Sequence, residues 1–342
     1  MRKNKPSIND LAERLKISKT TVSFIMNGKA KEKRISDELV KKVEKAALKL
    51  GYQANPYAKS LRTGRTNLIG LMVEDISNPF FSSIAKLIEE KIYANGYKVV
   101  YCSTENDKVR GREFLKMFSA LRVDGCIIAP TMGMESEIAE MVDRGMNIVL
   151  FDRKFRNKAT DVIMVDNRHG LHNAVTHLVQ QGFRNIALIT LAFDKPEKEE
   201  RVKGYLEAVA DHKLIPRLHA LPFKVRYQDY TQDIRSILEK TPDLEAVIFG
   251  TNYLGISGLE AIKSLKLSIP KDLAVVSFDD HDLFRIHEPG ISVVAQPIEE
   301  IAQTSIETLL KKLQSSGKTK SPETLVLKTS LIVRGSSSVV KP

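Results

Sequence analysis

Polar and charged side chains follow several short apolar runs in this 342-residue chain, where they could bind a small molecule. Ligands of open parallel sheets bind at the carboxyl ends of the strands, so the residues just beyond each run are the candidates. They are the stretch 74–80, Asp152, Arg153, Asn252, Asp279 and Asp280, together with Arg201 at the start of the helix that follows one of the runs. Carboxylates, an amide and a guanidinium suit vicinal hydroxyl groups, and Phe80 could stack on a sugar ring.

Each of these residues also has a purely structural interpretation. An aspartate at the end of a strand often caps the next helix. Asp152 could pair with its neighbour Arg153, and Phe80 could belong to the hydrophobic core. We expect Asp166 to cap the helix that follows it.

Motifs for catalysis are missing from the sequence. It contains no P-loop, no GxSxG elbow, no zinc-ligand spacing and no GxGxxG that follows a strand. We therefore expect no catalytic residue, no metal and no cofactor. An enzyme remains an alternative, because such a fold could host catalysis and seven histidines could supply a base.

From residue 67 onward, apolar runs alternate with helical patterns. The predicted strands are 68–73, 98–102, 126–129, 147–151, 186–190, 246–249 and 273–278. The predicted helices are 81–95, 109–121, 135–143, one that ends at 209, 256–265 and 299–313. Strands that are apolar throughout indicate parallel sheets covered on both faces. The rhythm occurs twice, which predicts two similar lobes with helix 299–313 in the second.

The positive charge of the chain is concentrated at its start. Residues 1–66 contain 17 Lys and Arg against 6 Asp and Glu, a balance of +11, which equals the net charge of the whole chain. The rest holds 36 basic and 36 acidic residues. A basic module joined to a neutral one is typical of nucleic-acid binding with a separate sensing or enzymatic domain.

The basic segment has the pattern of three short helices. Ser7 and Asp10 form a capping box, Ser18 is an N-cap candidate for a helix to Met26, and Ser36 caps a third helix that Gly51 stops. The second helix bears polar residues at its start, which predicts a helix-turn-helix that docks in a DNA major groove. Residues 55–62 form a further helical pattern too short to be stable alone, which suggests a segment that folds only with a partner.

Taken together, several motifs resemble the LacI/GalR family of bacterial regulators. They are SINDLA at 7–12, ISKTTVS at 17–23, NG at 27–28, GYQANP at 51–56 and AKSL at 58–61. The resemblance continues to the C-terminus. It implies an all-α headpiece (1–54), a hinge helix and linker (55–66), and a two-lobed α/β domain (67–342). The last domain would have the periplasmic-binding-protein type I fold, with a ligand cleft between its lobes.

The resemblance also implies which residues contact DNA. Lys19, Thr20 and Phe24 match base-reading positions, and Leu61 matches a leucine that wedges between base pairs in the minor groove. The full set of expected DNA contacts is Ser7, Ser18, Lys19, Thr20, Thr21, Ser23, Phe24, Asn27, Asn55, Ala58 and Leu61. Many relatives carry Arg at the position of Phe24. The charged loop 29–34, a residue or two longer than usual, could contact phosphate or remain solvated.

For the cleft, the resemblance assigns effector binding most firmly to Arg201 and Asp279. The other implied effector residues are Asp75, Phe80, Asp152, Asn252 and Gln296. Many relatives carry Asp at the position of Tyr253, so no particular effector can be transferred. A sugar or sugar derivative is expected, with a purine as the lesser option.

The resulting hypothesis is a sequence-specific transcription regulator, most simply a repressor. A homodimer would bind a pseudo-palindromic double-stranded DNA operator, and the effector would control its affinity allosterically. The sequence contains no export signal and no run long enough to cross a bilayer, which favours the cytoplasm and no membrane partner. The alternative is a sugar-binding protein or an enzyme on the same two-lobed fold.

Overall fold

The computed structural model describes residues 6–52, 64–155, 160–192, 199–224, 230–314 and 321–338. They form two compact units that divide between Thr66 and Asn67. Within the described ranges, no helix is both long and apolar enough to cross a membrane.

The described part of the first unit contains three helices, as predicted. They are α1 (Ile8–Leu15), α2 (Lys19–Met26) and α3 (Asp37–Leu50). Ser7, Ser18 and Ser36 cap them, each accepting a hydrogen bond from a backbone amide of the first turn. Because each cap satisfies an amide that has no partner inside its helix, the three serines determine where the helices begin.

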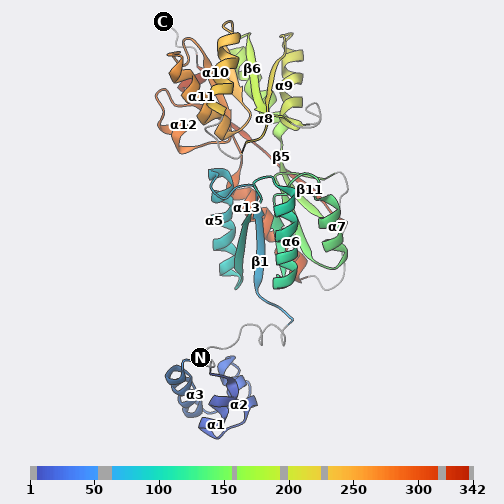
Figure 1. Cartoon of the computed structure of the whole chain (residues 1–342), viewed down its shortest axis with the longest axis vertical. Coiled ribbons are helices and arrows are strands. Elements are labelled where there is room, and N and C mark those ends of the chain that lie inside the picture. Colours follow the sequence, from blue (N-terminus) through green and yellow to red (C-terminus); the bar gives the residue numbers. More distant parts are fainter. Residues whose placement is uncertain are drawn as a thin grey trace. The chain divides into compact units, whose positions relative to one another are not determined.

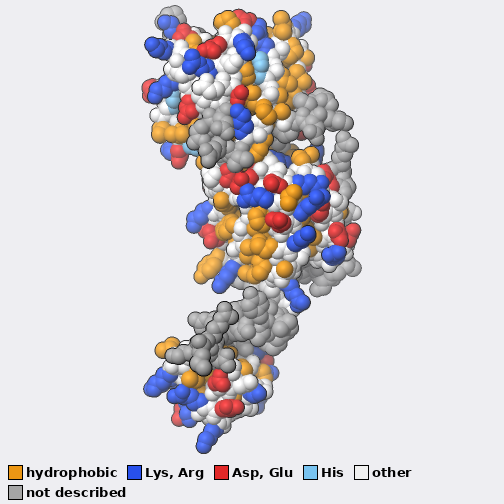
Figure 2. Space-filling model, in the orientation of Figure 1, with side chains coloured by type: hydrophobic (Ala, Val, Ile, Leu, Met, Phe, Trp, Pro, Cys, Tyr) orange, Lys and Arg blue, Asp and Glu red, His pale blue; other side chains and the backbone are white. Residues whose placement is uncertain are grey.

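One apolar side chain from each helix lies fully buried at the centre of this unit: Leu11, Val22 and Val43. The core is small, and basic side chains are exposed over the surface around it (Figure 2). The unit therefore has its own hydrophobic core and a basic exterior.

The second unit contains two lobes, each with a sheet covered by helices on both faces (Figure 1). The first lobe has the strand order β11-β5-β4-β3-β1-β2. Its strands are β1 (Leu68–Val73), β2 (Lys98–Ser103), β3 (Gly125–Ile128), β4 (Asn147–Phe151), β5 (Asp161–Val165) and β11 (Thr324–Leu327). Its helices are α5 (Pro79–Ala94), α6 (Lys108–Leu121), α7 (Glu135–Asp143) and α13 (Ile298–Gln314).

The second lobe repeats this arrangement with the order β12-β10-β9-β8-β6-β7. Its strands are β6 (Ile186–Leu191), β7 (Arg217–Leu221), β8 (Ala246–Phe249), β9 (Ala274–Phe278), β10 (Ser292–Ala295) and β12 (Ser330–Ile332). Its helices are α8 (Asn167–Gln180), α9 (Glu200–Asp211), α10 (Thr231–Lys240), α11 (Asn252–Ser264), α12 (Asp282–Ile286) and the 3₁₀ turn η3 (Gly335–Ser337). All strand pairs are parallel except β10 with β12.

Alternate residues of each central strand serve two cores. In β1, Leu71 packs with α5 and α13 on one face, whereas Met72 packs with α6 and α7 on the other. This two-sided burial explains why the strands are apolar throughout and confirms the predicted fold class.

The chain crosses between the lobes three times, after β5, after β10 and after β11. Helix α13 consequently lies in the first lobe, where it packs against α5 and β4. The prediction that residues 299–313 belong to the second lobe was wrong. A regular alternation of strands and helices in the sequence predicts where each element lies, but it does not show which of the two lobes an element joins.

Asp166 stands at the first crossing and does not cap α8 with its side chain, contrary to expectation. Its carboxylate accepts hydrogen bonds from the backbone amide and the hydroxyl of Thr329, at 2.6 and 2.7 Å. Thr329 stands at the third crossing, so this pair clamps two of the three connections together.

Several boundaries differ from the predictions because of polar caps. Helix α11 begins at Asn252 rather than 256, since Thr251 accepts a hydrogen bond from the amide of Leu254. Helix α5 begins at Pro79 because Asn78 caps it. The sequence pattern also missed the edge and crossover strands β5, β7, β10, β11 and β12 and the helices α10 and α12, and it gave no bounds for the helix α8 that follows Asp166.

Candidate functional site

Helix α2 of the first unit presents a polar face to solvent. Lys19 and Thr20 are exposed, whereas Ser23 and Phe24 are half-buried. Thr20 and Phe24 are four residues apart, so they lie on the same side of the helix. This face has the length and polarity to enter a major groove.

The other predicted contacts of this unit surround the helix ends. Ser18 Oγ accepts a hydrogen bond from the amide of Thr21 at 3.0 Å. Asn27 Nδ2 donates to the carbonyl of Ser23 at 2.6 Å. Ser7 caps α1 in the predicted capping box. Asn55, Ala58 and Leu61 lie outside the described residues.

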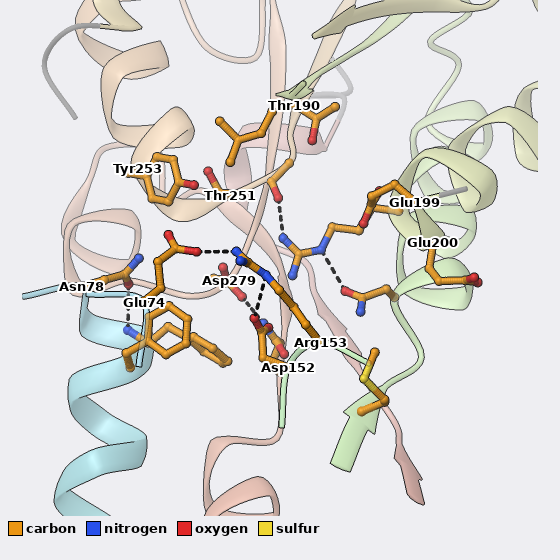
Figure 3. A pocket seen from close by; sticks show the side chains of 18 of the residues that line it. Glu74, Asn78, Asp152, Arg153, Thr190, Glu199, Glu200, Thr251, Tyr253 and Asp279 are labelled. Atoms are coloured by element: carbon orange, nitrogen blue, oxygen red, sulfur yellow. Dashed lines mark hydrogen bonds and ion pairs between the residues drawn. The ribbon is translucent and has the colours of Figure 1, made fainter. Parts of the chain in front are cut away.

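A cavity of about 250 Å³ lies in the second unit and is lined by residues of both lobes (Figure 3). Five of the seven predicted effector residues line it: Phe80, Asp152, Arg201, Asp279 and Gln296. They come from separate parts of the chain that only the packing of the two lobes brings together.

Asp152 and Asp279 occupy equivalent positions in the two lobes, directly after β4 and β9. Both have a left-handed backbone, with φ of 68° and 69°. Such a conformation is uncommon outside glycine and is often found at functional positions. The fold thus places one carboxylate from each lobe at the cavity.

Asp279 is buried and held by neighbours. Gln296 Nε2 donates to Asp279 Oδ1 at 2.6 Å. Burial raises the pKa of Asp279, and the opposing effects of the Arg201 charge and the Gln296 hydrogen bond do not cancel it. A buried carboxylate of this kind is a strong acceptor for a ligand hydroxyl.

Arg201 is oriented on three sides. Its Nε donates to Asn167 Oδ1 at 2.8 Å and its Nη1 to the carbonyl of Gly250 at 2.7 Å. The guanidinium lies over the ring of Phe278, 3.7 Å from the centroid. This support fixes the donor before any ligand arrives.

Two predicted residues do not line the cavity. Asp75 accepts hydrogen bonds from the amide and hydroxyl of Ser77, each at 2.8 Å. Asn252 donates to Asn78 Oδ1 at 2.9 Å, which joins a buried amide of the second lobe to one of the first. Asn252 therefore bridges the lobes beside the cavity.

Three further residues line the cavity: Glu74, Arg153 and Tyr253. Their positions after strands marked Glu74 and Arg153 as candidates, but the family resemblance assigned none of the three to the effector. Glu74 is buried and forms an ion pair with Arg153. Burial lowers the pKa of Arg153, but the charges of Glu74 and Asp152 outweigh this effect and raise the pKa overall. Burial, together with the charge of Glu74, raises the pKa of Tyr253. Glu74 directly follows β1, so its position was a usable signal, but whether it or Asp75 faces the cavity depends on the loop.

Two family models match the chain. "Bacterial regulatory proteins, lacI family" matches residues 7–55, and "Periplasmic binding protein-like domain" matches residues 175–337.

Curated relatives align along nearly the whole chain. The HTH-type transcriptional regulator KdgR of Bacillus subtilis is 30% identical over 96% of this chain and 97% of its own length. The sucrose operon repressor of Pediococcus pentosaceus is 31% identical over 91% and 94%, respectively. The ribose operon repressor of Haemophilus influenzae is 27% identical over 96% and 98%.

Solved structures share the fold. The lac repressor dimer bound to operator and an anti-inducer has a TM-score of 0.84 at 22% identity and covers 98% of this chain and all of that one. A LacI-family regulator from Enterococcus faecium with bound ribose has a TM-score of 0.71 at 25% identity, covering 80% of this chain and all of that one.

Proposed function

Because this chain belongs to the LacI family of bacterial transcription regulators, we propose that it is a non-enzymatic repressor controlled by a sugar-like effector. Sequence-specific DNA binding is the activity of the family. The observation that carries the effector role is the cavity between the lobes, which is lined by Asp152 of the first lobe and by Asp279 and Arg201 of the second. Carboxylates and a fixed guanidinium suit a molecule rich in hydroxyl groups.

The proposal assigns a task to each part of the chain. Residues 1–54 bind in the major groove and contact base edges. Residues 55–66 link this headpiece to the rest of the chain and contact the minor groove. Residues 67–342 bind the effector and dimerise. Two headpieces of a homodimer would meet half-sites about 34–36 Å apart on a pseudo-palindromic operator in the cytoplasm. Effector binding would change the angle between the lobes and, through it, operator affinity.

The DNA part of the proposal can be tested with the full-length chain and a random pool of double-stranded DNA. Repeated selection should enrich a pseudo-palindromic sequence. Affinity for that sequence should fall steeply as salt rises, because Lys and Arg displace counterions from the phosphates. Failure to enrich any sequence, or a flat salt response, would reject the regulator function.

The effector part can be tested by thermal unfolding with single compounds: ribose, xylose, glucose, fructose, ribose 5-phosphate, fructose 6-phosphate and adenine. A compound that binds only the folded protein raises its midpoint. The same compound should change affinity for the selected DNA. Arg201→Ala should remove both effects and leave DNA affinity unchanged in the absence of the compound, because Arg201 lies in the cavity unit.

A further inference from the structure

The loop between α2 and α3 is a built element of the first unit. The amide of Ile35 donates to the carbonyl of Ala30 at 2.9 Å, and that of Lys33 donates to Lys29 at 3.0 Å. Ala30 and Ile35 also pack against the core of the three helices. Gly28 starts the loop with a φ of 68°, a conformation that glycine adopts without strain. These contacts fix the backbone of the loop from which the charged side chains project.

One of these side chains lies against α2. The ammonium of Lys33 is 5.5 Å from the ring centroid of Phe24. The electron-rich face of an aromatic ring attracts a cation at this distance, and the attraction strengthens when water is excluded. Lys33 keeps 42% of its side-chain surface exposed, so its ammonium can still reach a partner outside the protein.

Phe24 shares its helix side with Thr20, the side proposed to face DNA. A phenyl ring can touch a thymine methyl group but offers no hydrogen bond to a base edge. The structure places a cation directly beside this ring, although the cation belongs to a different element. We propose that Lys33 is a base-reading residue, which donates to guanine O6 or N7 in the major groove with Phe24 as its platform. The inference rests on the proposed DNA-reading role of α2.

Glu32 sets the state of Lys33 in the absence of DNA. Its carboxylate lies 3.0 Å from the Lys33 ammonium and 3.8 Å from that of Lys29. Hydrogen bonding to Lys33 and the charges of both lysines lower the pKa of Glu32, so it is ionised at neutral pH. The phosphates of DNA would repel the Glu32 carboxylate. To bind guanine, Lys33 must give up its ion pair with Glu32. Glu32→Gln should therefore strengthen DNA binding.

The test compares Lys33→Met with Lys31→Met in the full-length chain. Lys31 is an exposed residue of the same loop and carries the same charge. Both variants are used to select from the random DNA pool and are then titrated with the sequence that the unchanged protein selects. Lys33→Met should lose a guanine preference at one position of each half-site, with affinity for that sequence lower by roughly tenfold. Lys31→Met should lower affinity to a similar small extent on every sequence and keep the preference.

A second variant tests whether Lys33 itself contacts the base. Phe24→Arg places a guanidinium on α2 itself, so adding Lys33→Met to this variant should cost less than twofold in affinity. The inference is overturned if Lys33→Met keeps the guanine preference, or if it loses affinity uniformly on every sequence as Lys31→Met does. In that case, selection of a sequence by the unchanged protein would still uphold the regulator function. If the unchanged protein selects no sequence, both fail together.

Discussion

At the scale of single residues, the cavity is dominated by charges that the protein itself has placed and paired. Glu74 and Asp152 share Arg153 in the first lobe, and Asp279 lies near Arg201 in the second. Burying such groups costs free energy unless partners are present. A site of this kind is prepared for a polar ligand at the expense of stability.

Asp279→Asn tests this cost. Burial puts the pKa of Asp279 in the folded protein above its ordinary value, so ionising the carboxyl at neutral pH reduces the free energy of unfolding. The reduction disappears as the pH falls through the folded-state pKa towards the ordinary pKa of an aspartate, 3.8. Asp279→Asn should therefore unfold at the same or a higher temperature than the unchanged protein at pH 7, with an advantage that shrinks towards pH 4.

Thermal unfolding followed by circular dichroism at both pH values gives the comparison. The variant should also lose the response to the effector. A much lower midpoint at pH 7 would show instead that the ionised carboxylate stabilises the fold.

At the scale of elements, local caps determine where the helices begin, whereas the absence of a side chain at a contact determines how closely two helices can pack. The three headpiece helices begin at serines that the sequence identifies. In the second unit, α8 and α9 approach closely because Gly204 has no side chain. The two kinds of constraint predict different consequences of substitution.

Ser18→Ala and Ser36→Ala form a matched pair. Each removes a side-chain cap and should destabilise its helix by about 1 kcal/mol. Hydrogen exchange of the helix amides in the full chain should show similar losses. Only Ser18→Ala should weaken binding to the selected DNA markedly, because Ser18 begins the proposed reading helix. Equal losses of DNA affinity would mean that headpiece stability, rather than the start of α2, is responsible.

Gly204→Ala should be poorly tolerated. A Cβ there would lie 1.9 Å from the backbone carbonyl oxygen of Arg168, and backbone cannot move aside as a side chain can. We expect a loss of about 3 kcal/mol or more in urea unfolding, the upper end for overpacking. Gly111→Ala is the control, because its Cβ would meet the flexible end of Met134. An equal or larger loss for Gly111→Ala would contradict this account.

At the scale of the whole second unit, the two lobes are joined by three crossings and by the buried Asn78–Asn252 pair. The clamp between Asp166 and Thr329 ties two of the crossings. Asn78 also caps α5 by accepting a hydrogen bond from Phe80. The bridge between the lobes is thus continuous with a helix of the first lobe.

Asn252→Ala should loosen the contact between the two lobes. It leaves the buried Asn78 amide without its partner across the lobes, at a cost of about 1–3 kcal/mol. Small-angle X-ray scattering without ligand should show a larger radius of gyration, and effector affinity should fall. Gln303→Ala is the control, because Gln303 donates only to Glu307 on its own helix among the described hydrogen bonds. An unchanged radius for Asn252→Ala would argue against a closing role.

The sequence by itself determined the helix-turn-helix, much of the alternation of strands and helices and four of the predicted effector residues that line the cavity, because these depend on local signals. Serine caps, apolar periodicity and polar residues at strand ends are all readable within a few positions. The family motifs extended that reading to Gln296, whose place at a crossing no local pattern shows.

Only the tertiary structure decided what long-range packing controls. It placed α13 in the first lobe, turned Glu74 rather than Asp75 to the cavity, and used Asn252 as a bridge. It also brought Lys33 of the loop to Phe24 of α2. Each outcome depends on the path of a loop or crossing relative to a distant element, and the spacing of residues along the chain does not encode that path.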